Sequence, residues 1–286
     1  VTLVELEPTI LSRAFDKEFG DKAEELLVKR GVKVITGKGV KEIIGTDGKV
    51  SSVILTSGEE IEADAVILSM GYAPNTALAE KSGLELNKFG FIKTCEYMRV
   101  ENCSSDIFAV GDCAEKRDFL TRRLSTTMLA STACAEARVA GMNLYELSPC
   151  KVFGGTIAIY NTAIGDSAFG TAGITEERAR QDNFDVVVGS FTGIDKHPRT
   201  LEGTHEQTVK LIVAGDCGMI IGGEVFGGIS IGELTNTLGF LIQNHVNVKT
   251  LLTAQIGTHP MLTGSPAAYP LIKAAEIVAK KLKCRS

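Results

Sequence analysis

Short apolar runs and one amphipathic segment alternate along the start of the chain. Residues Glu18–Gly31 place apolar side chains on one face at helical spacing, which predicts a helix. The turn residues Thr46–Lys49 separate two apolar runs and predict a hairpin. The runs that predict strands are 1–6, 32–36, 40–44, 50–56 and 61–69. The last of them is nearly continuous, as in a strand that is buried on both faces.

The middle of the chain is less regular until residue 105. Residues Ser105–Val110 form an apolar run that predicts a strand, and Gly111 and Asp112 follow it directly. A helix is predicted over Thr126–Tyr145, and it is unusually rich in alanine and other small residues. Small side chains let a helix approach a sheet or a ligand closely, and close packing alone explains them equally well.

The pattern changes near residue 149, where a series of amphipathic strands begins. The expected strands are 152–160, 165–172, 184–193, 206–214 and 218–226, and the expected helices are near 175–182, 230–245 and 267–283. The stretch Gly215–Gly218 lies between two of these strands and predicts a hairpin turn. The sequence therefore predicts an α/β part followed by an α+β domain with an antiparallel sheet.

The composition excludes some classes of partner. The 286 residues, 44% hydrophobic and 23% charged, are typical of a globular chain long enough for about two domains. The net charge of -5 lacks the basic character of a protein that binds nucleic acid or an anionic membrane. No run approaches the roughly 18 apolar residues of a membrane span. Neither nucleic acid nor a membrane is an expected partner.

The cysteines indicate a reducing compartment. The seven are odd in number, scattered and never spaced as C-x-x-C: Cys95, Cys103, Cys113, Cys134, Cys150, Cys217 and Cys284. This argues against a secreted disulfide framework and against a zinc knuckle, so we expect no metal site. We expect free, mostly buried thiols in a protein of the cytoplasm.

The strongest chemical signal is the predicted strand that ends in Gly111-Asp112. A glycine there lets the backbone approach a ligand closely, and the carboxylate can accept hydrogen bonds from sugar hydroxyls. The same dipeptide can also simply turn the chain, as Gly215-Asp216 shows. The stretch Ser104–Glu115 resembles the second FAD-binding motif of the FAD-dependent pyridine nucleotide-disulfide oxidoreductase family. The resemblance implies that Gly111 and Asp112 bind FAD and that Asp112 holds its ribitol chain.

The helix after this motif carries a second implied contact with FAD. In the family, the first N–H groups of that helix point at the flavin ring, where their partial positive charge stabilises arriving electrons. The residues at the matching place are Leu129, Ala130 and Ser131.

Two further segments resemble the NAD-binding part of the same family. An acidic residue at the place of Glu5 accepts hydrogen bonds from the adenosine ribose and repels a 2′-phosphate, which favours NADH over NADPH. A solvated charge at a strand end explains an isolated glutamate equally well. The stretch Ala65–Thr76 resembles the family's strand and Gly-x-x-Pro-Asn crossover, which places Gly71 close to the nicotinamide.

The stretch Gly257–Gly264 resembles the His-Pro segment in the interface domain of disulfide reductases. There a histidine of one subunit reaches the flavin site of the other as an acid or base, and a glutamate five residues on orients it. The candidate catalytic residue is therefore His259, but Gly264 occupies the place of the glutamate. This puts a dithiol mechanism in doubt, and a structural or substrate-contacting role for His259 is equally open.

The resemblance spans the chain and implies its organisation. It implies the rear part of an NAD-binding domain over 1–73, the rear part of an FAD-binding domain over 74–148, and an interface domain over 149–286 that forms a homodimer. Within the family, the NADH oxidase and CoA-disulfide reductase branch matches best. Its activity passes a hydride from NADH to FAD and then electrons to a small acceptor, which is oxygen, peroxide or a disulfide.

Two other interpretations remain open: a disulfide reductase whose redox cysteine lies upstream, and a non-catalytic dimerisation module. Residues 1–5 have the pattern of an already formed strand, and the glycine-rich pyrophosphate loops of the family are absent from the sequence. We therefore expect this chain to be a C-terminal piece of the enzyme, inactive by itself and binding FAD weakly or not at all.

Overall fold

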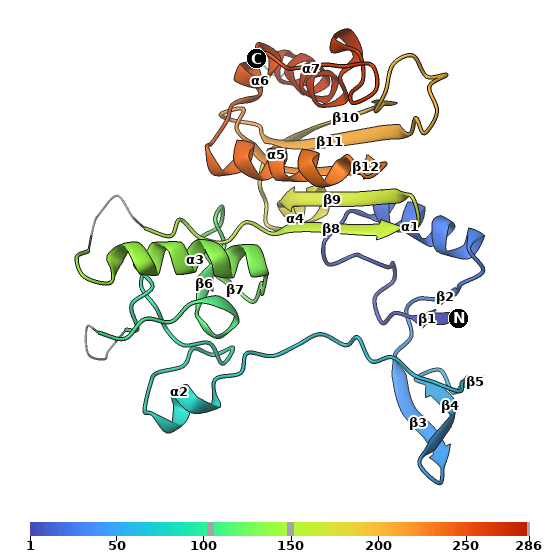
Figure 1. Cartoon of the computed structure of the whole chain (residues 1–286), viewed down its shortest axis with the longest axis vertical. Coiled ribbons are helices and arrows are strands. Elements are labelled where there is room, and N and C mark those ends of the chain that lie inside the picture. Colours follow the sequence, from blue (N-terminus) through green and yellow to red (C-terminus); the bar gives the residue numbers. More distant parts are fainter. Residues whose placement is uncertain (102–105, 148–151, 285–286) are drawn as a thin grey trace. The chain divides into compact units, whose positions relative to one another are not determined.

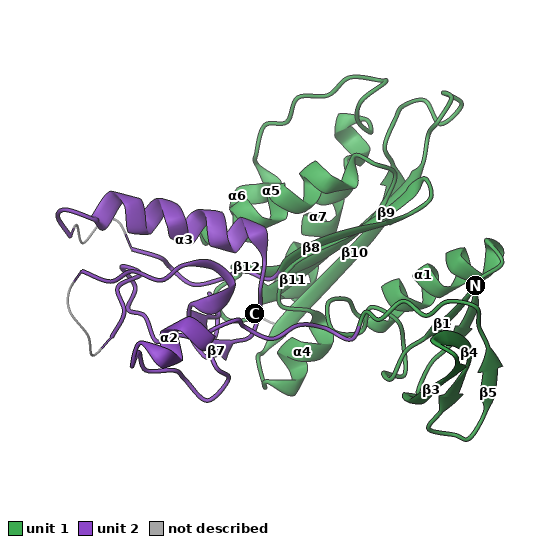
Figure 2. Cartoon of the chain, turned by 60° about the horizontal axis from the view of Figure 1, so that its bottom comes forward, with its two compact units in different colours: residues 1–69, 159–286 green, residues 70–158 purple. Residues whose placement is uncertain are grey.

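The computed structural model describes residues 1–101, 106–147 and 152–284. They fall into two units, which Figure 2 distinguishes by colour. One unit contains residues 1–69 and 159–286, and the other contains residues 70–158.

A five-stranded antiparallel sheet organises the first unit, as the sequence predicted (Figure 1). Its strands are β8 (Ile159–Ile164), β9 (Ser167–Gly173), β10 (Val186–Ile194), β11 (Glu206–Ala214) and β12 (Ile220–Gly227). The spatial order is β10-β11-β12-β9-β8. The prediction of a strand from residue 152 is wrong for 152–158, where Thr156 makes only an isolated bridge to Asp118. The pair Gly154-Gly155, the second with a φ of +107°, interrupts an extended run there.

Helices pack against the sheet at the predicted places. α5 (Ile231–Gln243) lies against β9 and β12, and α7 (Pro270–Lys283) lies against β10 and β11. The short helix α4 (Glu176–Gln181) is also at its predicted place, whereas α6 (Val248–Leu252) and the 3₁₀ turn η2 (Pro266–Ala268) were not predicted. Among the residues that the structure describes, no helix is both long and apolar enough to cross a membrane.

Adjacent residues of a strand point to opposite faces of the sheet, so the two faces of β12 have different neighbours. Gly223 lies against Leu238 of α5. The next residue, Glu224, therefore points to the other face, where it meets Asp16. The helix α1 (Lys17–Lys29) follows Asp16. The buried side of α1 packs against the sheet through an apolar cluster that includes Phe19 of the helix and Phe169 of β9.

The rest of residues 1–69 forms two small sheets. β1 (Thr2–Val4) and β2 (Lys33–Ile35) are paired in parallel. β3 (Val40–Thr46), β4 (Lys49–Leu55) and β5 (Glu60–Glu62) form an antiparallel sheet. Asp47 and Gly48, both with positive φ, make the predicted hairpin turn between β3 and β4.

The prediction of a buried strand over 61–69 is wrong. β5 ends at Glu62, and no strand of the described residues pairs with 65–69. Ile67 is 91% exposed and Leu68 is 61% exposed. An apolar run becomes a buried strand only when neighbouring strands satisfy its backbone groups, and these residues have no such neighbours here.

The second unit has little regular structure besides one long helix, α3 (Ala130–Asn143). Its other elements are α2 (Ala77–Lys81), the 3₁₀ turn η1 (Gly111–Cys113), β6 (Lys116–Arg117) and β7 (Leu124–Ser125). The helix predicted over 126–145 is thus confirmed, although it begins later, at Ala130, and ends earlier, at Asn143. A strand ending at Val110 is not formed, because Ile107 and Ala109 pair only with the irregular segment around Met98 and Val100. Ser104 and Ser105 lie outside the described residues.

Candidate functional site

Gly111 and Asp112 begin a tight 3₁₀ turn. Val110 is extended, and Gly111 then takes a φ of +77°, which favours glycine over any residue with a Cβ atom. Asp112 is exposed, and its carboxylate makes no side-chain hydrogen bond within the described ranges. The turn thus presents a carboxylate that is free to accept hydrogen bonds from a ligand.

Helix α3 packs against this turn. Ala133 lies where a Cβ on Gly111 would approach to 3.5 Å, so small residues on both sides allow close contact. The residue before the helix, Leu129, is extended and makes no side-chain capping bond. Ala130 and Ser131 are exposed. The first N–H groups of a helix carry partial positive charge, so this end of α3 is suited to a negatively polarised ligand group.

Two fully buried charged side chains, Lys116 and Glu136, support the turn from behind. Their charged atoms are 3.7 Å apart. Glu136 Oε2 accepts a 2.6 Å hydrogen bond from the backbone N–H of Gly111, and Lys116 Nζ donates to the carbonyl groups of Gly111 and Ala114. The sequence analysis missed both residues. Glu136 could have been noticed, because it falls at helical spacing with Val139 on the buried face of α3.

The environment of Glu136 holds opposing influences on its protonation. Burial raises the pKa of Glu136, and the ammonium of Lys116 and the N–H of Gly111 oppose that rise. The carboxylate of Asp112 adds a smaller upward effect. Glu136 Oε1 has no hydrogen-bond partner among the described residues. The negative charge of Asp112 therefore raises the pKa of Glu136 slightly, which agrees with the position of the two residues on either side of Gly111.

The residues predicted to contact NAD lie in different units. Glu5 is half-buried after β1, and its Oε1 accepts a 2.9 Å hydrogen bond from the N–H of Glu7, which fixes its side chain. Gly71 belongs to the other unit, where it is exposed and has a φ of +91°. Each has a conformation compatible with its predicted role, and those roles stay predictions.

His259 is exposed in the segment before η2. Its Nδ1 accepts a hydrogen bond from the backbone N–H of Met261 at 3.2 Å. The disulfide-reductase arrangement is the reverse, since there a carboxylate accepts from the ring. A bond of this sense leaves the proton of the neutral ring on Nε2, so His259 faces solvent as a donor. A cavity of about 210 Å³ beside Thr263 and Gly264 does not include His259 in its lining.

The cysteines differ in part from the prediction. The five described ones, Cys95, Cys113, Cys134, Cys217 and Cys284, are free, as expected. The expectation that they are mostly buried is wrong, because the last three are exposed and the first two are partly exposed. Cys134 falls on the outer face of α3, and Cys217 falls in the predicted Gly215–Gly218 turn between β11 and β12. Cys103 and Cys150 lie outside the described residues.

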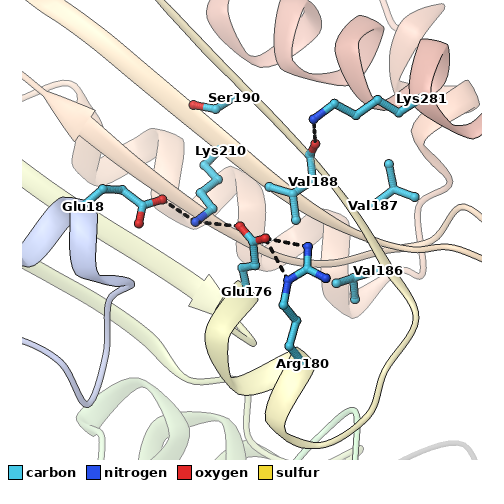
Figure 3. Close-up of a pocket in the computed structure, with 9 residues that line it drawn as sticks. All are labelled: Glu18, Glu176, Arg180, Val186, Val187, Val188, Ser190, Lys210 and Lys281. Carbon is cyan, nitrogen blue, oxygen red and sulfur yellow. Dashed lines mark hydrogen bonds and ion pairs between the residues drawn. The ribbon is translucent and has the colours of Figure 1, made fainter.

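A second buried group of charges lies in the other unit, around Lys210 of β11 (Figure 3). Lys210 Nζ lies 2.7 Å from Asp16 and 3.1 Å from Glu176, and it also pairs with Glu18. Arg180 binds the same Glu176 on the rim of a cavity of about 470 Å³. The charged side chains of Glu18, Glu176, Arg180 and Lys210 that line this cavity pair with one another, and Lys281 donates to the carbonyl of Val188. The group therefore joins the start of α1 to the sheet and to α4.

Glu224 completes this group from β12. It is fully buried, its Oε1 accepts the backbone N–H of Asp16 at 2.6 Å, and its Oε2 lies 3.5 Å from Lys210 Nζ. Burial and the neighbouring Asp16 carboxylate raise the pKa of Glu224 to about 9. The pKa of Asp16 is lowered instead, because hydrogen bonds and the charge of Lys210 outweigh the effect of its burial. Glu224 is thus the uncharged acid of the group at neutral pH.

Comparison with known families accounts for both units. A family model described as pyridine nucleotide-disulphide oxidoreductase matches residues 1–137, and the dimerisation domain of that family matches residues 159–268. The two models together cover most of the chain. The chain belongs to the pyridine nucleotide-disulphide oxidoreductase family, whose Rossmann-like part is followed by a dimerisation domain with the five-stranded sheet described above.

Individual relatives agree with this assignment. An NADH oxidase of Methanocaldococcus jannaschii is 30% identical over 99% of this chain and 60% of its own length. The structure of an NAD-dependent persulfide reductase from A. fulgidus is 27% identical, with a TM-score of 0.90 over 99% of this chain and 51% of that one. An FAD-dependent pyridine nucleotide-disulphide oxidoreductase from Desulfovibrio vulgaris is 26% identical, with a TM-score of 0.79 over 98% of this chain and 64% of that one. The chain spans less than two thirds of each relative.

Proposed function

We propose that the whole protein containing this chain is an FAD-dependent NADH oxidoreductase of the NADH oxidase kind. The observation that carries the proposal is the turn at Gly111, which presents beside the start of α3 the carboxylate of Asp112, without a hydrogen-bond partner among the residues that the structure describes. A sugar-alcohol chain needs an acceptor of that kind, and an electron-rich ring edge needs the positive end of a helix. The FAD-dependent relative and the NADH oxidase relative support the same conclusion.

Different residues of the chain would bind FAD and NADH. Gly111 and Asp112 would hold the ribitol of FAD, and the N–H groups at Leu129, Ala130 and Ser131 would face its ring. Glu5 would bind the adenosine ribose of NADH, and Gly71 would leave room for the nicotinamide. When bound, the flavin supplies a hydride acceptor and passes electrons to the second substrate. From the resemblance of the sequence to the family, we also infer domain limits at residues 73 and 148.

The second substrate is a small molecule, and two classes fit the relatives. Oxygen or peroxide corresponds to the NADH oxidase relative, and a disulfide or persulfide corresponds to the persulfide reductase relative. We favour the oxidase, because Gly264 replaces the carboxylate that would orient His259 in a dithiol mechanism. A purely dimerising role is the remaining alternative. The free cysteines support a location in the cytoplasm.

We further propose that residues 149–286 form a homodimer. The segment matches the family's dimerisation domain, and Ile229, Phe240 and Leu262 expose large apolar side chains. Sedimentation at micromolar concentration is expected to give the mass of two chains. Replacing Phe240 and Leu262 together with serine should shift the protein toward a monomer. A monomer before any substitution would contradict the proposal.

The activity itself is tested by mixing the oxidised whole protein with NADH or NADPH in the absence of oxygen. NADH is expected to bleach the flavin absorbance faster than NADPH, because the charge of Glu5 opposes a 2′-phosphate. The substitution Glu5→Ala should reduce that preference by about tenfold, which corresponds to roughly 1.4 kcal/mol. Glu7→Gln is the matched control, since it removes a nearby acid and keeps the N–H that binds Glu5. A flavin that neither nucleotide bleaches would contradict the proposed function.

A further inference from the structure

The backbone around Asp112 is held from one side by charged groups that are hidden from solvent. Glu136 Oε2 accepts the N–H of Gly111, which immediately precedes Asp112. Lys116 Nζ donates to the carbonyl groups of Gly111, the first residue of the turn, and of Ala114, the residue after it. Neither side chain has any exposed surface. One buried ion pair therefore fixes the N–H of Gly111, the carbonyl group that joins Gly111 to Asp112, and the carbonyl group of Ala114.

A purely structural role explains this arrangement poorly. Removing two charges from water is costly, and an apolar pair of similar volume often gives equal or greater stability. In addition, Glu136 Oε1 has no hydrogen-bond partner among the described residues, so the pair is incompletely satisfied. The one hydrogen bond of Glu136 among the described residues is directed at the backbone of Gly111 rather than at another buried side chain. The polar groups of the pair thus act on the turn.

Among the described residues, the other hydrogen bonds of the turn do not involve α3: the backbone N–H of Ile92 donates to the carbonyl of Cys113 at 2.8 Å. Cys113 Sγ makes only a 3.5 Å contact with the carbonyl of Val110. The backbone N–H of Ala114 donates to Gly111, which closes the 3₁₀ turn but leaves its direction relative to α3 open. Glu136 lies on α3 itself, six residues after Ala130. Its bond to Gly111 therefore couples the turn directly to the helix whose start faces the ligand.

We propose that the buried Glu136–Lys116 pair positions the Gly111–Asp112 turn against α3, so that FAD affinity depends on two side chains that do not touch FAD. This inference rests on the proposed function, because it assumes that Asp112 binds the flavin. Glu136 and Lys116 are positioning residues. Their loss should misdirect the Asp112 carboxylate without removing it.

The most informative variant replaces both members of the pair, Lys116→Met with Glu136→Met, in the whole flavoprotein. The double variant keeps the buried volume and leaves no unpaired buried charge, but the N–H of Gly111 and the carbonyl of Ala114 lose partners, so it should fold with a melting temperature somewhat below that of the parent. Its dissociation constant for FAD, measured by flavin fluorescence on titration of the apoprotein, should rise at least about tenfold. The visible circular dichroism of the remaining bound flavin should also change.

Single substitutions separate the contributions. Glu136→Gln keeps an acceptor for the N–H of Gly111 and should retain more affinity for FAD than Glu136→Ala, although both weaken the pair. The matched control is Asn143→Ala. Asn143 lies seven residues after Glu136 on α3, and the substitution removes its buried hydrogen bond to the carbonyl of Val139. It should lower the melting temperature and leave the dissociation constant for FAD unchanged.

The substitution Asp112→Ala distinguishes the two possible failures. If Asp112→Ala leaves FAD affinity unchanged, the proposed flavin site is wrong, and the positioning role falls with it. If Asp112→Ala weakens binding but the folded double variant binds FAD as tightly as the parent, the positioning role alone is overturned. Weakened binding in both, with a double variant that is folded at the temperature of the titration, is the expected result.

Discussion

Replacing Asp112 with alanine is expected to weaken FAD binding by the whole protein roughly 10- to 100-fold. The reason is that hydrogen bonds to a charged group contribute about 1.5–3 kcal/mol, and the ribitol hydroxyls would lose theirs. Asp112 is exposed and makes no side-chain hydrogen bond in the parts of the chain that are described, so its removal should not destabilise the fold. Equilibrium dialysis or flavin fluorescence measures the change.

The chain contains its own control for this experiment. Asp216 also follows a glycine and is also exposed, but it lies in the hairpin between β11 and β12 and binds the N–H of its neighbour Cys217. Asp216→Ala is therefore expected to leave FAD affinity unchanged. Equal losses for the two substitutions would show that the carboxylate of Asp112 has no specific role.

The second large effect is expected for Lys210→Met, which should lower the free energy of unfolding by about 3 kcal/mol. This is the lower end of the range for breaking a buried ion pair. The loss is limited because Glu224 is uncharged at neutral pH and Glu18 can turn to water, so that mainly Asp16 is left without its cation. Urea unfolding followed by circular dichroism measures the change. Lys17, which forms an exposed ion pair with Asp21, provides the control. Lys17→Met should lower the free energy of unfolding by less than about 1 kcal/mol.

The same group of charges gives the stability a defined dependence on pH. Glu224 has a pKa near 9 in the folded chain and an ordinary, lower pKa when unfolded, so the folded state binds the additional proton between these values. Stability should therefore decline as pH rises toward 9, by at most about 1.4 kcal/mol per pH unit. The lowered pKa values of Asp16 and Glu176 act only in acid, and the raised pKa of Lys210 acts only in strong alkali.

The substitution Glu224→Gln isolates this effect. Glutamine resembles the protonated acid and cannot ionise, so the variant should lose less stability than the parent between pH 6 and pH 9. The difference between the two slopes belongs to Glu224, because the lowered pKa values of Asp16 and Glu176 keep both carboxylates ionised in that range. Parallel curves for parent and variant would mean that Glu224 is already ionised at neutral pH.

Local patterns in the sequence predicted much of this fold. The hairpin at Asp47-Gly48 depends on two adjacent residues with positive φ, and the strands of the five-stranded sheet are apolar runs separated by turn residues, although β12 is buried along its whole length. The five-residue helix α6 was missed because a single turn and a half of helix has almost no periodicity. Residues 61–69 were predicted wrongly because apolar character alone does not specify which strands lie beside a segment.

The candidate site was predictable only where its residues are adjacent in sequence. Gly111 and Asp112 are adjacent in sequence, so their pattern is visible, and the glycine is required by a positive φ. The supporting pair was not visible, because Lys116 and Glu136 are 20 positions apart and meet only when α3 packs against the turn. Likewise, the bond from Met261 to His259 depends on a local backbone conformation that no residue type specifies.

The most direct test of this account is a structure of the whole protein with FAD bound. We expect an oxygen of the Asp112 carboxylate within about 2.6–3.0 Å of a ribitol hydroxyl, with Gly111 still bonded to Glu136. A structure in which FAD is bound elsewhere, with Asp112 directed into solvent, would contradict the account.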